Sequence, residues 1–293
     1  MPTSELMPRW IRANGLDFSI LEAGEGPLVL CLHGFPDTAW NMRAIVLALA
    51  AAGYRAVAPF MRGYAPTSLA ADDDYRATTL ARDALALIDA LGETNAFIVG
   101  HDWGAVTAYL AAATEPKKVR GIVSAAIPHL RRFLLRPTLR QLYRSRYMGF
   151  FQLRGIPEQR IVADDFRSLR ALIHRWSPSW KFTEEEFAPL KAGFSDPARL
   201  SAALAYYRDL PRTLLNGENA ALIFGKLPVS ARVICGEEDG CIGAEMFKDQ
   251  DYCFGASYEL ITMKGAGHFM QCEQPTQFAA HVLEFLNRES RRS

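Results

Sequence analysis

The sequence has little cysteine and no pattern that would link its cysteines. Their number is odd, and no two of them are separated by only two residues. Disulfide-rich scaffolds and Cys-x-x-Cys zinc sites need closely spaced cysteines, so both are excluded, and we expect reduced thiols and a cytoplasmic location. The five cysteines are Cys31, Cys235, Cys241, Cys253 and Cys272.

Neither charge sign is in excess, and long hydrophobic runs are absent. With 33 basic and 32 acidic residues the net charge is +1, which gives no reason to expect a nucleic-acid partner. Charged residues interrupt every apolar stretch before the roughly 18 residues that a transmembrane helix needs. The N-terminal residues lack the basic start and apolar run of a signal peptide, so none is expected.

What the sequence does contain is a regular alternation of strand-like and helix-like segments. Asn14-Gly15 favours a tight turn, so the first two strands should form a hairpin. The alternation that follows predicts an α/β fold with a mostly parallel, doubly wound sheet. The expected strands are 9–13, 16–21, 27–32, 55–59, 96–99, 119–126, 229–235 and 257–261, and the expected helices are 42–52, 78–91, 103–113 and 275–288.

The alternation stops between 129 and 225, where the sequence is rich in arginine and aromatic residues and mostly helical in pattern. The strand pattern then resumes. We therefore predict a core domain over 1–128 and 226–293, interrupted by a helical cap domain over 129–225.

Gly100-His101-Asp102-Trp103-Gly104 stands between a predicted strand and a predicted helix. It has the G-x-S-x-G spacing of a nucleophile elbow, with aspartate in place of serine. The glycines permit a tight turn that directs the central side chain into the cleft at the carboxyl end of the sheet. Asp102 is thus the predicted nucleophile, although this motif alone also fits a carboxylate that merely caps the helix.

A histidine and an acid complete the predicted catalytic triad. His268 lies in a glycine-rich loop after the last strand, where the chain order nucleophile, acid, histidine requires the base. Among the carboxylates of Gly236-Glu237-Glu238-Asp239-Gly240, Asp239 is favoured because it has room to turn back toward His268. Glu238 is the alternative acid, and a solvated acidic loop is the non-catalytic interpretation.

The loop His33-Gly34-Phe35-Pro36 follows the strand 27–32. Such a loop can direct a backbone N–H at the nucleophile, beside the N–H of the residue that follows the nucleophile. The predicted oxyanion hole is therefore formed by the N–H groups of Phe35 and Trp103, with an ordinary strand-end turn as the alternative. The predicted substrate pocket, whose aromatic lining favours apolar ligands, contains His33, Pro36, Phe150, Phe151, Trp176 and Trp180.

A carboxylate nucleophile restricts the chemistry. Attack on an acyl carbon would give an anhydride, whereas attack on a saturated carbon gives an alkyl ester that can form and be hydrolysed. Because the carboxylate is already ionised at neutral pH, the histidine must act on the water that attacks the ester. We expect no metal and no cofactor.

Six stretches carry a resemblance that covers nearly the whole chain. By these stretches the chain resembles the epoxide hydrolases of the α/β-hydrolase superfamily, which implies the α/β-hydrolase fold with an inserted cap. The resemblance also implies conversion of an apolar epoxide and water to a vicinal diol. The stretches are HGFPDTAW (33–40), GHDWGA (100–105), FFQLRGIPE (150–158), YYR (206–208), GEED (236–239) and GAGHFMQCEQP (265–275).

The resemblance further implies two cap tyrosines that donate hydrogen bonds to the epoxide oxygen. By motif position these are Tyr147 and Tyr207, and their phenols stay protonated at neutral pH. Tyr143 and Tyr206 are the neighbours that could be mistaken for them. Simple packing over the cleft is the alternative role.

The chain departs from the family pattern at two places, and two functions other than epoxide hydrolysis fit the same catalytic residues or the same fold. Phe60 and the pair Ala65-Pro66 differ from the usual residues, which bears on pocket shape rather than on chemistry. A haloalkane dehalogenase would use the same machinery, but such enzymes often carry asparagine where this chain has Phe35. A non-catalytic ligand-binding module on the same fold is the second alternative.

Arginines are concentrated at the start of the predicted cap. Arg136, Arg140 and Arg144 recur every four residues, which predicts one shared helix face. Between Glu115 and Glu158 the chain has ten basic residues and no acidic one. A solvated face is the ordinary interpretation, and docking of an anionic partner, a membrane or a second subunit of a homodimer is the alternative.

Overall fold

An eight-stranded sheet runs through the protein, whose computed structural model describes residues 6–291. The strand order is β1-β2-β4-β3-β5-β6-β7-β8; β1–β2 and β2–β4 pair antiparallel, and the other pairings are parallel. The predicted hairpin and mostly parallel sheet are thus confirmed. The strands are β1 (Arg9–Ala13), β2 (Leu16–Ala23), β3 (Leu28–Leu32), β4 (Arg55–Pro59), β5 (Ala96–His101), β6 (Val119–Ala125), β7 (Ala231–Gly236) and β8 (Tyr258–Met263).

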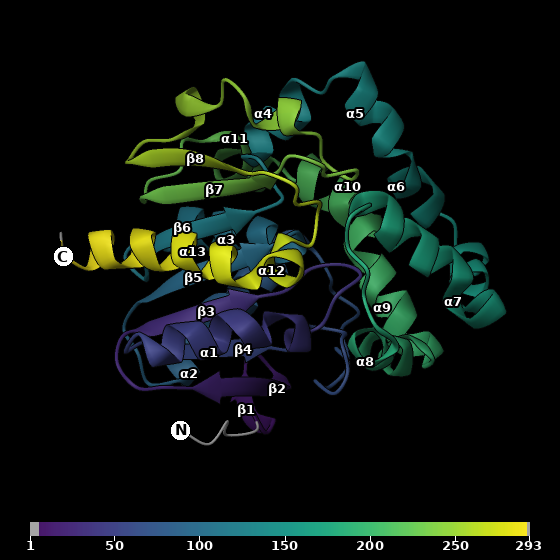
Figure 1. The fold of residues 1–293 in the computed structure, drawn as a ribbon, viewed down its shortest axis with the longest axis horizontal. Helices are drawn as coiled ribbons and strands as arrows, with labels where there is room; N and C mark the ends of the chain where they lie inside the picture. Colours follow the sequence, from purple (N-terminus) through teal and green to yellow (C-terminus); the bar gives the residue numbers. More distant parts are fainter. Residues whose placement is uncertain (1–5, 292–293) are drawn as a thin grey trace.

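Helices cover both faces of the sheet, and alternate strand residues supply the two layers of core. In β3, Leu28, Leu30 and Leu32 pack on the side of α2 and α3, whereas Val29 and Cys31 pack on the side of α1 and α13. This double burial is why the central strands are continuously apolar. The covering helices are α1 (Arg43–Ala51), α2 (Ala77–Ala90), α3 (Trp103–Thr114), α12 (Met270–Glu273) and α13 (Pro275–Ser290) (Figure 1).

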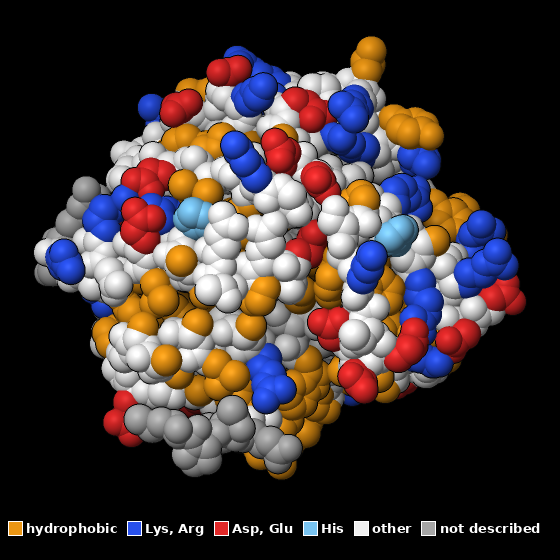
Figure 2. Space-filling view, viewed as in Figure 1, with side chains coloured by type: hydrophobic (Ala, Val, Ile, Leu, Met, Phe, Trp, Pro, Cys, Tyr) orange, Lys and Arg blue, Asp and Glu red, His pale blue; other side chains and the backbone are white. Residues whose placement is uncertain are grey.

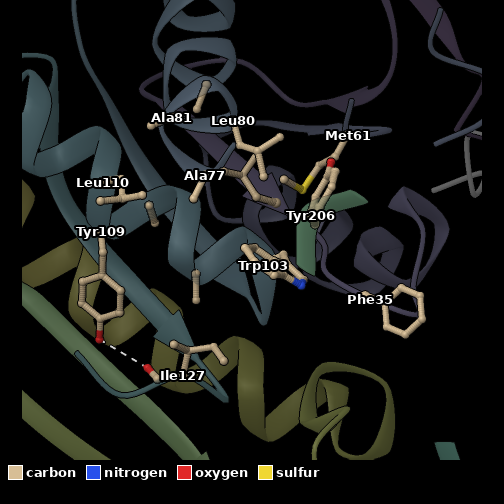
Figure 3. Close-up of a cluster of buried hydrophobic side chains, with 14 of the residues drawn as sticks. Phe35, Met61, Ala77, Leu80, Ala81, Trp103, Tyr109, Leu110, Ile127 and Tyr206 are labelled. Carbon is tan, nitrogen blue, oxygen red and sulfur yellow. Dashed lines mark hydrogen bonds between the residues drawn. The ribbon is translucent and has the colours of Figure 1, made fainter. Parts of the chain in front are cut away.

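Eight helices between β6 and β7 form a layer beside the sheet. Most of them lie at the right of Figure 1, beyond the carboxyl ends of the parallel strands. One buried cluster contains Phe35 and Trp103 from the core together with Tyr206 from this layer (Figure 3). The helices are α4 (Leu130–Leu135), α5 (Leu139–Arg144), α6 (Arg146–Phe151), α7 (Ile156–Trp176, with a kink at 163–166), α8 (Glu184–Phe194), α9 (Pro197–Arg208), α10 (Leu210–Leu215) and α11 (Ala220–Phe224).

The predicted arginine face is wrong, because Arg136 does not share a helix with the other two arginines. Helix α4 ends at Leu135, and Pro137 lies in the break that follows it. Proline cannot continue a helix, and α5 starts afresh after Thr138, whose hydroxyl accepts a hydrogen bond from the N–H of Gln141 (3.0 Å).

Phe60 lies away from the predicted site. Its side chain is buried in the cluster on the α1 side, where it packs edge-on against Trp40 at 6.0 Å between ring centroids.

Within residues 6–291 no helix is both long and apolar enough to cross a membrane. The expectation of no signal peptide concerns a segment whose first five residues lie outside the described part, and the domain boundaries at 129 and 225 stay a prediction.

Substitution of Gly100 should destabilise the fold at the strand-to-helix turn. A Cβ on Gly100 would lie 2.2 Å from the carbonyl oxygen of Gly104, so the turn would have to open. We expect Gly100→Ala to lower the free energy of unfolding by about 1–3 kcal/mol in urea titrations. Gly149 in α6 is the matched control, since its Cβ would meet nothing within 4 Å and alanine favours helix. Equal losses in both variants would contradict this account.

Candidate active site

Asp102 occupies a strained turn between β5 and α3. Its backbone has φ +50° and ψ −117°, a conformation that L side chains rarely adopt. The turn fits because Gly104 lets α3 approach β3: a Cβ there would lie 2.1 Å from the carbonyl oxygen of Leu32. The Asp102 side chain is only 5% exposed.

One of the two predicted oxyanion donors contacts the Asp102 carboxylate. The N–H of Phe35 donates to Oδ1 of Asp102 (2.8 Å). Trp103 is the first residue of α3, so its N–H has no carbonyl partner within the helix. Oδ1 is therefore held by the Phe35 amide, and Oδ2 is the oxygen nearer to His268.

His268 lies between two buried carboxylates. Its Nδ1 is 2.9 Å from Oδ2 of Asp239, and its Nε2 is 3.7 Å from Oδ2 of Asp102. Oδ1 of Asp239 accepts hydrogen bonds from the N–H groups of Cys241 (2.7 Å) and Ile242 (2.9 Å). Of the two acids weighed from the sequence, it is thus Asp239 that contacts His268.

Glu238 points elsewhere. Its side chain is exposed and accepts a hydrogen bond from the hydroxyl of Ser179 (2.6 Å).

Burial alone would lower the pKa of His268, but the charges and hydrogen bonds of Asp239 and Asp102 raise it to about 10. At neutral pH the free protein therefore holds His268 as an imidazolium between the two acids.

One backbone carbonyl group accepts hydrogen bonds from both the loop of Asp239 and the loop of His268. The carbonyl oxygen of Trp176 accepts from the N–H of Gly240 (3.0 Å) and from the N–H of His268 (3.1 Å). Next to it, the hydroxyl of Ser177 donates to Glu273 (2.7 Å), whose carboxylate also accepts the N–H of the residue before His268. Sequence reasoning missed these contacts; only the match of the 265–275 stretch, which contains Glu273, pointed near them.

His33 is bonded on both ring nitrogens to backbone groups. Nε2 accepts from the N–H of Met61 (3.0 Å), and Nδ1 lies 3.0 Å from the carbonyl oxygen of Gly34. Because Nε2 is an acceptor, the ring is neutral, and burial lowers its pKa further. His33 therefore braces the loop that carries Phe35 instead of facing a ligand.

A cavity next to Asp102 brings both predicted tyrosines to the nucleophile. Tyr147 from α6 and Tyr207 from α9 line it together with Asp102 and Trp103. The rest of its wall is mostly aliphatic. It comes mainly from α2 and α3, which cover the sheet, and from the helices between β6 and β7. The other lining residues are Ala77, Val106, Leu110, Ile127, Leu130, Phe133, Leu134, Met148, Leu210, Thr213, Leu214, Ile223 and Ile242.

The aromatic residues of the predicted pocket lie outside this cavity. His33, Pro36, Trp176 and Trp180 do not line the cavity, and Phe150 and Phe151 line a separate groove between α6 and α7. The indole of Trp176 instead packs against the ring of His268, with centroids 5.0 Å apart. Aliphatic side chains on cap helices have the same periodicity whether they face the core or a cavity, so the sequence did not separate them.

The two tyrosine hydroxyls are buried and available as donors. The hydroxyl of Tyr147 lies 3.5 Å from the sulfur of Cys241, and that of Tyr207 has no well-formed hydrogen bond within the described chain. Burial, and then nearby groups that include Asp102, raise the pKa of both tyrosines well above the ordinary value. Both phenols therefore stay protonated over the range in which enzymes work.

The two neighbouring tyrosines do not face the cavity. The hydroxyl of Tyr206 donates to the carbonyl oxygen of Arg62 (2.7 Å), which fixes the cap on the core. Tyr143 is 66% exposed at the surface of α5.

The comparisons with known proteins agree with this geometry. Residues 27–275 match the family model of the α/β-hydrolase fold. Epoxide hydrolase A of Mycobacterium tuberculosis is 31% identical, over 95% of this chain and 96% of the relative. An AB hydrolase superfamily protein of Bacillus subtilis, YfhM, is 30% identical over 96% of this chain and 98% of its own.

Solved structures give the same result. An epoxide hydrolase from Vigna radiata superposes with a TM-score of 0.85 at 28% identity, covering 98% of this chain and 99% of the other. The chain therefore belongs to the α/β-hydrolase superfamily and, within it, to the epoxide hydrolases, a family of enzymes.

The raised pKa of His268 should make stability depend on pH. The folded-state pKa of about 10 exceeds that of an unfolded histidine, roughly 6.5, so its stabilisation is complete below the lower value. The stabilisation is then lost as the pH rises toward 10. We expect the difference in unfolding free energy between the wild type and His268→Gln to shrink from about pH 7 to about pH 9.5.

Urea titrations of both proteins across this range measure the difference. Both proteins contain the same tyrosines and cysteines, so the contribution of these groups cancels in the difference between the two unfolding free energies. A gap that stays constant with pH would contradict the raised pKa.

Proposed function

We propose that the protein converts apolar epoxides to vicinal diols through a covalent ester on Asp102. The observation that carries the proposal is one cavity in which a buried carboxylate faces two protonated phenols across apolar walls. His268, whose Nε2 lies 3.7 Å from Oδ2 of Asp102, is the base for hydrolysis. Apolar walls favour a substrate whose only polar atom is the epoxide oxygen.

In the first step Oδ2 of Asp102 attacks a saturated carbon of the epoxide. Oδ1 is already engaged by the N–H of Phe35, which leaves Oδ2 as the free nucleophilic oxygen. As the carbon–oxygen bond of the ring breaks, the departing oxygen takes a proton from Tyr147 or Tyr207, the two phenols at the cavity. This step consumes one proton and leaves a neutral ester.

In the second step water attacks the carbonyl carbon of the Asp102 ester. Ester formation removes the negative charge of Asp102, one of the two that raise the pKa of His268. The imidazolium then gives up its proton, which restores the phenol that was deprotonated in the first step, and the neutral His268 accepts a proton from the attacking water. Charge develops on Oδ1, which the N–H of Phe35 already contacts, and the N–H of Trp103 at the start of α3 is the proposed second donor. Collapse releases the diol, restores the carboxylate and returns the proton that the first step consumed.

The phenols favour an epoxide over a haloalkane. A halide leaves as a stable anion that needs hydrogen-bond donors but takes no proton. An alkoxide is a strong base and needs a donor. A non-catalytic ligand-binding module would have no use for a buried acid–base pair next to the carboxylate.

A single turnover in ¹⁸O-labelled water tests the ester. With enzyme in excess over an aryl epoxide, the first diol should contain no label, because its new oxygen comes from Asp102. The label should instead appear in the peptide that contains Asp102, and in diol from later turnovers, as read by mass spectrometry. Labelled diol in the first turnover would rule out the ester, and ligand binding without any diol would favour the binding module.

Removal of either phenol should slow ring opening. We expect Tyr147→Phe and Tyr207→Phe each to lower kcat/KM by on the order of 10² or more, as loss of a general acid does. Tyr143→Phe is the matched control, because Tyr143 is exposed and outside the cavity, and it should keep the wild-type rate. Wild-type rates in both cavity variants, or release of bromide from a bromoalkane at a comparable rate, would overturn the epoxide assignment.

A further inference from the structure

The outer side of the segment from α4 to α6 exposes large apolar side chains next to arginines. Leu135, Leu139, Leu142 and Tyr143 are 58%, 86%, 55% and 66% exposed. Apolar side chains gathered at this density on a surface indicate an interaction site. We call this surface the cap patch; it comprises Leu135, Arg136, Leu139, Arg140, Leu142 and Tyr143.

The arginines of the cap patch, Arg136 and Arg140, are exposed and have no carboxylate partner within residues 6–291, although the guanidinium of Arg136 stacks on the ring of Tyr252 at 4.9 Å from its centroid. Arg144, by contrast, is already paired with Glu245 (3.0 Å). In Figure 2 the upper right edge, over α5 and α6, shows basic and hydrophobic side chains side by side.

The inner side of the same segment lines the catalytic cavity. Leu130, Phe133 and Leu134 of α4 and Met148 of α6 face the cavity that contains Asp102. One short stretch of chain therefore connects an amphipathic surface to the site of chemistry.

We propose that the cap patch docks onto an anionic lipid surface, with the leucines inserted among the lipids and the arginines on the headgroups. Mixed apolar and basic side chains are the pattern by which proteins bind anionic bilayers from one side. A second copy of the chain fits less well, because a two-fold contact between two cap patches would bring four arginines and no acidic side chain of either patch into one interface.

Docking would place the cavity beside the phase in which apolar substrates collect. Apolar epoxides partition from water into lipid, so a cap held at the bilayer meets them at a higher local concentration. This consequence rests on the proposed function, whereas the docking itself does not.

Vesicle flotation without any substrate tests the docking. The protein should float with vesicles of phosphatidylcholine and phosphatidylglycerol, float much less with phosphatidylcholine alone, and dissociate as salt screens the headgroups. Arg136→Glu with Arg140→Glu should lower the partition coefficient roughly tenfold or more, and Leu139→Glu with Leu142→Glu should do the same. Both double variants should keep the wild-type rate on a water-soluble epoxide, since none of these residues lines the cavity.

Arg43→Glu with Lys117→Glu is the matched control. Both residues are exposed on the core and have no acidic partner in the described chain, so this variant changes the net charge equally and should still float. Absence of wild-type binding to anionic vesicles, or loss of binding in the control alone, would overturn the proposal. A dimer in sedimentation velocity that dissociates in Leu139→Glu with Leu142→Glu would assign the cap patch to a second copy instead. Because no turnover is measured in flotation, failure of the proposed function would leave this result intact.

Discussion

Asp102 and Asp239 are both buried carboxylates, and a carboxylate taken out of water without compensation is costly enough to be neutralised or paired. His268 lies between them and supplies one positive charge for two negative ones. Backbone amides supply the remaining compensation, from Phe35 to Asp102 and from Cys241 to Asp239. These groups come from loops after β3, β5, β7 and β8, so the balance exists only if the strands end at one edge. The parallel order of the sheet provides that edge.

The helices between β6 and β7 also hold in place the loops that carry these charges. The carbonyl oxygen of Trp176, at the end of α7, receives hydrogen bonds from the loops of both Asp239 and His268. Moving the end of α7 would break two backbone hydrogen bonds, one to the loop of Asp239 and one to the loop of His268. The end of α7 is therefore part of the site's framework, whereas α4 and α6 contribute side chains to the cavity wall.

The local features of the fold and site were predictable from the sequence. The elbow around Asp102 was found because glycine spacing reports a tight turn, and the strands were found because double burial makes them continuously apolar. The lining of the cavity was not found, because Leu130 or Leu210 has the pattern of any core leucine. The role of the Trp176 backbone was also invisible, since a carbonyl group is common to every residue. Arg136 was misassigned because its spacing was given more weight than Pro137, which interrupts the helix.

The aliphatic wall has a consequence for how this protein distinguishes between related molecules. Apart from the Asp102 carboxylate and the two phenols, the cavity offers almost nothing polar for a substituent to bind, so recognition there is a matter of volume. In an apolar pocket one methylene changes discrimination by only about 1–3 kcal/mol. Leu134, Leu214 and Ile223 belong to this wall, so a shorter or longer side chain at one of them changes the space in the cavity without altering Asp102 or the phenols.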